Sequence, residues 1–273
     1  MKKDDIKIIF VDIDNTIYDH IKRHNFDLKS IEALNAMHRR GVQIIICTAR
    51  PIYSIRDFGV FKYLEYDGII GSNGAVYVYH DEWFDRYLFP KETIKNMLEV
   101  TNKYKLTVEL ITFDDRFYTP YKSEHVDLYH REYFENDACI DVFNNQDIIS
   151  VLLSAPNELD DTLRKELPKE ILYYRFTNFG VDLVVKDHNK GNGVKVFLEK
   201  LNISKDNAIA FGDDYQDIAM FKQVKYGIAV GNARDKVKEN ATEVTKKVSE
   251  HGVYHYLKKE KLIKTNIFGK IKG

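Results

Sequence analysis

Two aspartates near the start of the chain, Asp12 and Asp14, have the type and spacing that chemistry at phosphorus requires. They follow the apolar run Ile8–Val11 and are joined by Asn15 and Thr16. A short apolar run that ends in turn residues is typical of a buried strand, so both carboxylates are expected at a strand end. One carboxylate could attack a phosphorus atom while the other transfers protons.

A second group of acids follows another apolar run, far along the chain. The sequence Gly-Asp-Asp-Tyr-Gln-Asp occupies residues 212–217, directly after the apolar residues 208–211. In an open parallel sheet, ligands bind beyond the carboxyl ends of the strands. If the two strands are neighbours, Asp12 and Asp213 converge there, and such an all-oxygen, carboxylate-rich site suits Mg²⁺.

Two further polar residues stand at comparable positions. Thr48 follows the apolar residues 42–47, and Lys190 opens a helix that we expect over about residues 192–201. A lysine at a helix start can meet phosphate oxygens and keep a nearby carboxylate ionised. Alone, each residue has an ordinary explanation as a helix cap or a surface charge. Their joint order, at strand ends and a helix start, favours a shared site.

Strand and helix signals alternate at both ends of the chain, which predicts the elements that position these residues. Strands are expected at residues 6–11, 42–47, 67–71, 208–211 and 226–230. Helices lie between them, the first running from Ser30, its expected N-cap, to Arg40. Apolar strands separated by helices imply a parallel sheet that is covered on both faces.

The middle of the chain has a different texture, with alternating strand patterns and a helical stretch around residues 158–166. This mixture indicates a separate α+β unit. We therefore predict an α/β protein with a Rossmann-like parallel-sheet core, residues 1–82 and 188–273. Residues 83–187 form the predicted inserted α/β domain.

Composition limits the class of partner. The net charge is −1 and the pI is about 6.8, which argues against nucleic acid as the main partner. No stretch approaches the roughly 18 apolar residues that a membrane span needs. Two cysteines, Cys47 and Cys139, give no basis for a disulfide framework, so we expect a cytoplasmic protein. A small molecule is the expected partner, and the protein is expected to be a monomer or a homodimer.

The order of the four motifs, D-x-D-x-T, a threonine, a lysine before a helix and G-D-D-x-x-D, resembles the haloacid dehalogenase superfamily of phosphohydrolases. Ser-Asn-Gly-Ala at 72–75, Gly-Asn-Ala at 231–233 and the size of the insertion make the chain similar to the Cof-type sugar-phosphatase group. In that group the insertion is a large α/β cap. The resemblance implies a Mg²⁺-dependent phosphatase that acts on a small phosphorylated metabolite, with a sugar phosphate as the leading class.

The resemblance also implies catalytic roles for four residues. Asp12 would be the nucleophile that forms an aspartyl-phosphate. Asp14 would protonate the leaving oxygen and then deprotonate the hydrolytic water. Thr48 and Lys190 would hold the phosphoryl oxygens.

The metal and substrate residues are implied in the same way. Mg²⁺ would be held by Asp12, the backbone carbonyl of Asp14 and Asp213, with Asp217 supporting the metal waters or Lys190. Asn73 and Gln216 are the further substrate- or phosphate-binding candidates. Gln216 departs from the family pattern, which usually has asparagine, so the contact assigned to that amide stays open.

Several alternatives remain at this stage. A phosphomutase would share the phospho-aspartate chemistry, and a non-enzymatic phosphosugar sensor or an aspartate-phosphorylated receiver would share part of the residue set. Arg50 could reach phosphate or serve as a cap or surface residue. Packing or solvation is expected for the other candidates near the leaving group, Arg116, Tyr118, His125 and His188. The lysine-rich tail from Lys258 is expected to be solvated.

Overall fold

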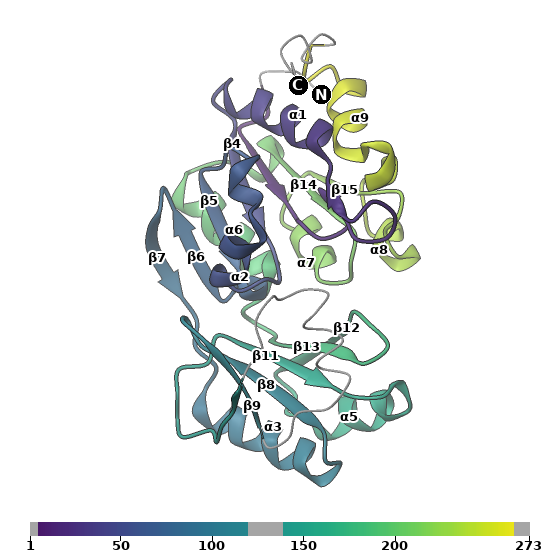
Figure 1. The fold of residues 1–273 in the computed structure, drawn as a ribbon. Helices are drawn as coiled ribbons and strands as arrows, with labels where there is room; N and C mark the ends of the chain where they lie inside the picture. Colours follow the sequence, from purple (N-terminus) through teal and green to yellow (C-terminus); the bar gives the residue numbers. More distant parts are fainter. Residues whose placement is uncertain (1–4, 120–138, 265–273) are drawn as a thin grey trace.

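The computed structural model describes residues 5–119 and 139–264, which form two units that each contain a sheet (Figure 1). The larger sheet has eight strands in the order β16-β15-β14-β1-β4-β5-β6-β7. In that order their bounds are Glu243–Val244, Tyr226–Ala229, Ala208–Gly212, Ile8–Val11, Gln43–Cys47, Gly68–Gly71, Val76–Tyr79 and Glu82–Arg86. The strands from β16 to β5 are parallel, whereas β6 and β7 pair antiparallel at one edge. The short strands β2 (Tyr18–Asp19) and β3 (Asn25–Phe26) form a separate hairpin after β1.

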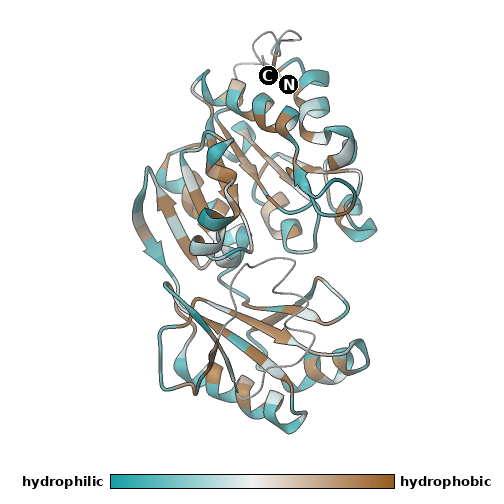
Figure 2. Ribbon diagram, viewed as in Figure 1, coloured by the Kyte–Doolittle hydropathy of each residue, from teal (hydrophilic) through white to brown (hydrophobic). Residues whose placement is uncertain are grey.

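Helices cover both faces of the larger sheet because its central strands are apolar on both sides. Ile9 and Val11 of β1 pack in one core, while Ile8 and Phe10 pack in the other. The helices of this unit are α1 (Leu28–His38), α2 (Ile52–Phe58), α6 (Lys190–Lys200), α7 (Asp217–Phe221), α8 (Asp235–Glu239) and α9 (Gly252–Lys259). Figure 2 shows hydrophobic strands inside and hydrophilic outer helix faces.

The first helix corrects one expectation, because Asp27 and not Ser30 is its N-cap. The Asp27 carboxylate accepts a hydrogen bond from the backbone N–H of Ser30 at 3.3 Å. The buried Ser30 hydroxyl instead accepts from the backbone N–H of Tyr254 at 3.1 Å, which ties α1 to α9. Lys258 lies in the last turn of α9, and residues 265–273 of the tail lie outside the described residues.

The smaller sheet has six strands in the order β10-β9-β8-β11-β13-β12. Their bounds are Cys139–Ile140, Arg116–Thr119, Thr107–Ile111, Ser150–Ser154, Gly180–Val185 and Ile171–Arg175. Helices α3 (Lys91–Lys103) and α5 (Asp160–Glu166) cover one face. The opposite face of this sheet is turned toward the larger unit (Figure 1).

The sequence places a domain boundary between residues 82 and 83, which falls inside strand β7. Strand β7 is hydrogen-bonded to β6 and so continues the larger sheet through Arg86. The chain then crosses to the smaller unit near Tyr87 and returns near His188, where the two rings stack at 3.4 Å. A core domain of residues 1–82 and 188–273 with an inserted domain of residues 83–187 remains a prediction. In the described part of the chain, no helix is long and apolar enough to cross a membrane.

Candidate active site

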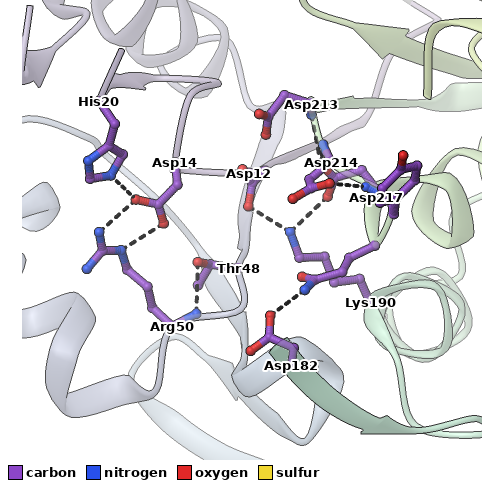
Figure 3. Close-up of polar contacts among 12 residues, drawn as sticks. Asp12, Asp14, His20, Thr48, Arg50, Asp182, Lys190, Asp213, Asp214 and Asp217 are labelled. Atoms are coloured by element: carbon purple, nitrogen blue, oxygen red, sulfur yellow. Dashed lines mark hydrogen bonds and ion pairs between the residues drawn. The ribbon is translucent and has the colours of Figure 1, made fainter. Parts of the chain in front are cut away.

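Three aspartates come together at the carboxyl ends of two neighbouring strands (Figure 3). Asp12 follows β1 and Asp213 follows β14, and these strands pair in parallel with Val11 beside Phe211. Asp217 opens α7. One ligand atom from each of the three side chains lies within 4.8 Å of the other two. The convergence of Asp12 and Asp213 that the strand pattern predicts is therefore present in the fold.

Asp217 holds the acidic loop in shape. Its Oδ2 accepts hydrogen bonds from the backbone N–H groups of Asp213 and Asp214 at 2.8 and 3.0 Å. Gly212 is required beneath it, since a Cβ there would lie 2.4 Å from the Asp217 carboxyl carbon. The fully buried Asp217 therefore orders the loop, and its remaining oxygen faces Lys190.

Lys190 lies between two of the acids. Its Nζ donates to Asp12 Oδ1 at 2.7 Å and to Asp217 Oδ1 at 2.8 Å. The residue is the first of α6, and the Asn189 side chain caps that helix. Burial opposes the charge of Lys190, but Asp12 and Asp217 outweigh it and hold its pKa well above the usual value. The ammonium group is thus permanently charged.

The acids nevertheless carry more negative charge than Lys190 compensates. Burial raises the pKa of Asp12 to about 8, although Lys190 acts against the shift. Burial, together with Asp12 and Asp217, also holds the pKa of Asp213 well above its usual value. Buried charges need a counter-charge, and a divalent cation would supply it. The all-oxygen donor set and its close spacing fit Mg²⁺.

The Asp14 side chain turns away from this cluster (Figure 3). Arg50 donates to both of its carboxylate oxygens, from Nε at 2.8 Å and from Nη2 at 2.7 Å. His20 Nε2 lies 2.5 Å from Oδ1. Burial opposes the charge of Asp14, but Arg50 and His20 outweigh it and hold its pKa well below the usual range. In this arrangement Asp14 can accept a proton but has none to donate.

Arg50 is therefore a site residue whose role the sequence left open. It is buried, and its guanidinium group also lies over the Phe58 ring, 3.8 Å from the centroid. A surface role is excluded by this burial. His20 was missed altogether, because a lone histidine in a loop after the D-x-D-x-T motif has no distinguishing pattern.

Thr48 and Asn73 lie close together under the site. Thr48 is fully buried, and its hydroxyl accepts from the backbone N–H of Arg50 at 3.2 Å. The backbone N–H of Asn73 donates to the Thr48 carbonyl at 3.1 Å. Asn73 has a positive φ of 57°, a conformation that asparagine tolerates. Both residues are placed at the carboxyl edge of the sheet, and neither lines the cavity above it.

Gln216 contacts the smaller unit. Its Nε2 donates a hydrogen bond to the carboxylate of Asp182, and both side chains are buried. Asp182 lies in β13 and was not among the sequence candidates. The available signal was a charged residue inside the apolar run of residues 181–185.

A cavity of about 120 Å³ lies over the acids and is lined by both units. The larger unit contributes the acidic loops, Arg50 and Lys190. The smaller unit contributes Ile111, Ser150, Leu152, Phe176 and Asp182. The smaller sheet thus covers the reactive groups, as a cap would.

The remaining candidates lie elsewhere. Arg116 is buried and pairs with Glu109 at 3.2 Å, and Tyr118 is fully buried. His188 stacks on Tyr87 at the crossing between the units. His125 lies outside the described residues.

Comparison with known proteins decides the family. Residues 9–257 match the sequence model of the haloacid dehalogenase-like hydrolases. The chain belongs to this family. YkrA of Bacillus subtilis is a relative of this hydrolase, 28% identical over 264 residues, with 95% of this chain and all of YkrA covered.

Two further relatives are named phosphatases. Phosphoglycolate phosphatase 1 of Saccharolobus solfataricus is 24% identical and covers 97% of this hydrolase with 99% of its own length. The 5-amino-6-(5-phospho-D-ribitylamino)uracil phosphatase YcsE of Bacillus subtilis is 26% identical and covers 91% with 93% of its own length. The hydrolase described here is accordingly a phosphatase.

Solved structures confirm the fold class. The sugar phosphatase BT4131, of subclass IIB of this superfamily, superposes with a TM-score of 0.84 at 24% identity. The superposition covers 94% of this hydrolase and the whole of BT4131. The predicted α/β fold, with a Rossmann-like core and an inserted α+β unit, and the resemblance to Cof-type phosphatases are confirmed.

Proposed function

We propose that this hydrolase is a Mg²⁺-dependent phosphatase that releases phosphate from a small phosphorylated metabolite, with a sugar phosphate as the leading class. The proposal includes an aspartyl-phosphate intermediate on Asp12. The observation that carries it is the meeting of Asp12, Asp213 and Lys190 at the ends of adjacent strands, inside a covered cavity.

Asp12, Asp213 and the backbone carbonyl of Asp14 would hold the Mg²⁺ ion. Asp217 supports that site indirectly, because its two oxygens bind Lys190 and the loop amides. When bound, the cation supplies positive charge that draws phosphoryl oxygens to the site and keeps the neighbouring carboxylates ionised.

Asp12 is the proposed nucleophile because the family resemblance assigns the attack to this position and its side chain lines the cavity beside Lys190. Asp217 also meets Lys190, but its other oxygen accepts hydrogen bonds from the loop amides. An Asp12 oxygen bonds to phosphorus as the bond from phosphorus to the leaving oxygen breaks, and the leaving oxygen takes a proton. Water then attacks the aspartyl-phosphate, loses a proton and releases phosphate together with free Asp12. The ammonium group of Lys190, which lines the cavity, stabilises the oxygens that gain charge. The same role for the Thr48 hydroxyl rests on the family resemblance alone, because Thr48 does not line the cavity.

Asp14 is the proposed proton carrier, and its contacts with Arg50 and His20 affect which protons it can transfer. Held by Arg50 and His20, its carboxylate is ionised but only weakly basic, because both partners lower its pKa. To protonate a leaving group it must first take up a proton and separate from Arg50. We therefore include in the proposal a change of the Asp14–Arg50 pair when substrate enters.

The test is hydrolysis of p-nitrophenyl phosphate with and without Mg²⁺, in the wild-type protein and in Asp12→Asn. Turnover that needs the metal and is lost in Asp12→Asn supports the proposal. Asp235→Asn, at a side chain that is 95% exposed, is the matched control and should keep full activity. A sensor or a receiver would give no steady turnover, and a phosphomutase would transfer phosphate to a second hydroxyl group rather than release it. Oligomeric state and cytoplasmic location stay predictions.

A further inference from the structure

The contact between Asp182 and Gln216 is the feature that the catalytic proposal leaves unexplained. Along β13, Val181, Leu183 and Val185 pack into the apolar core under α3 and α5. Since side chains alternate across a strand, Asp182 points to the opposite face, where it lines the cavity over Asp12 and Lys190. A carboxylate thus reaches into the reactive space from the smaller unit.

This carboxylate is costly to bury. Asp182 is only 6% exposed. Burial raises its pKa to about 7, although hydrogen bonding to Gln216 and to Asn73 acts against the shift. An ionised carboxylate can accept about four hydrogen bonds, so the amides of Gln216 and Asn73 still leave acceptor capacity for a ligand.

The other residues of the smaller unit that line the cavity indicate which kind of ligand could bind there. Besides Asp182, this wall of the cavity consists of the Ser150 hydroxyl and three apolar side chains, Ile111, Leu152 and Phe176. Among the described residues of the smaller unit that line the cavity, none is a cation. Such a wall offers acceptors and apolar contact, which suits a neutral carbon skeleton with hydroxyl donors. Above about pH 7, where Asp182 is ionised, it would repel a carboxylate or a second phosphate in the leaving group.

We propose that Asp182 is a specificity-determining residue that accepts a hydrogen bond from a hydroxyl group of the leaving group and selects neutral polyol and sugar monophosphates over anionic ones. Gln216 is the positioning residue that orients Asp182. Its side chain is one methylene longer than the asparagine usual in the family, and its amide reaches β13. This inference rests on the proposed phosphatase function and adds the class of substrate to it.

The test compares kcat/KM for four monoesters, a hexose monophosphate, a pentitol monophosphate, phosphoglycolate and p-nitrophenyl phosphate, in the wild type and in Asp182→Asn. The wild type should prefer the first two to phosphoglycolate.

Asp182→Asn should lower kcat/KM for the two polyhydroxylated substrates by about tenfold or more, the effect of losing one hydrogen bond to a charged group. Hydrolysis of p-nitrophenyl phosphate, which offers no hydroxyl group to Asp182, should fall by a smaller factor, and the relative rate on phosphoglycolate should rise. Asp161→Asn, on the exposed side of α5, is the matched control and should change none of these ratios.

Two further measurements keep the inference testable if Asp182→Asn is poorly folded. Gln216→Ala retains Asp182 and should weaken the preference for polyhydroxylated substrates. It should do so by raising KM more than by lowering kcat. Calorimetry on Asp12→Asn and on the double variant Asp12→Asn/Asp182→Asn measures the binding of a hexose monophosphate without turnover. The double variant should bind it about tenfold more weakly than Asp12→Asn does.

The outcomes separate the two proposals. A wild type that prefers phosphoglycolate, or an Asp182→Asn variant that changes all four substrates by one common factor, overturns the inference. In either case, metal-dependent turnover that is lost in Asp12→Asn would leave the proposed function standing. Absence of hydrolysis of every monoester by the wild type would remove both.

Discussion

Replacing Lys190 by methionine is expected to destabilise the protein by about 3–5 kcal/mol, the cost of removing one partner from a buried ion pair. Methionine keeps the approximate length of the side chain but removes its charge. The Lys190 ammonium group lies 2.7 and 2.8 Å from Asp12 and Asp217. These three side chains are 3%, 6% and 0% exposed, so water cannot replace the lost partner.

The assay is urea unfolding near neutral pH without divalent ions, with Lys195→Met as the control. Lys195 lies on the same helix, but its pair with Glu199 is 3.8 Å long and both side chains are more than 60% exposed. An exposed pair contributes at most about 1 kcal/mol. A loss of less than about 1 kcal/mol in Lys190→Met would refute the claim that this ammonium compensates the buried acids.

The effect of Lys190→Met on the free energy of unfolding should also depend on pH. The Asp12 pKa is raised from 3.8 to about 8 in the presence of Lys190, which itself lowers it. Without Lys190 it is higher still. A raised folded-state pKa stabilises the protein below the unfolded value and loses that contribution as pH rises. The difference between wild type and Lys190→Met should therefore stay nearly constant from about pH 4 to pH 8 and widen above about pH 8, where Asp12 ionises in the folded wild type but stays protonated in the folded variant. Mg²⁺ should narrow it, because removal of the Lys190 charge beside Asp12 lets the variant bind the cation more tightly than the wild type does. Ligand at a hundred times its Kd stabilises by about 2.7 kcal/mol.

Three further substitutions test separate parts of the site. Arg50→Gln should cost about 2 kcal/mol near neutral pH, the scale of a hydrogen bond to a charged group. Because the pKa of Asp14 is depressed from 3.8, this cost should be present in full above about pH 4 and decrease as pH falls from there toward the depressed folded-state pKa, measured by urea unfolding at a series of pH values. Asp213→Asn should weaken Mg²⁺ binding by about tenfold or more in calorimetry, and unchanged affinity would exclude Asp213 as a ligand, with Asp235→Asn as the control. Gln216→Asn should leave phosphate release from p-nitrophenyl phosphate within about tenfold, or under about 1.4 kcal/mol, and a larger change would place this amide at the phosphate.

The meeting of Asp12 and Asp213 could be predicted from the sequence because strand ends are strongly encoded. Strand β1 and strand β14 are unbroken apolar runs, and each is followed at once by acids. Parallel strands place such residues on one edge of the sheet, so the pairing of β1 with β14 is enough to bring Asp12 and Asp213 together. The position of Lys190 could be predicted for the same reason, since the helix that it opens begins beside that edge of the sheet.

The contacts of Asp14 and Gln216 could not be predicted in this way. Whether Asp14 faces the phosphate or Arg50 depends on side-chain rotation after the strand has ended, and no periodic pattern records that choice. The partner of Gln216 lies in β13, in the other sheet. Its identity depends on how two independently patterned units pack. The N-cap of α1 was misplaced for a similar reason, because Ser30 is used in a tertiary contact with α9.

The loop of residues 212–217 joins the chemistry to the covering unit. Asp213 belongs to the acid cluster, and Gln216 bonds to Asp182 of the smaller sheet. Asp214 pairs with Arg234 at 2.7 Å, and Arg234 donates to the carbonyl of Phe176, which also lines the cavity. A displacement of the smaller unit would break both contacts and release the loop that positions Asp213. Because Asp217 ties the amides of this loop to Lys190, the same movement would also disturb the charge balance at Asp12. The smaller unit and the loop that carries Asp213 are thus joined through the contacts of Gln216 and of the Asp214–Arg234 pair.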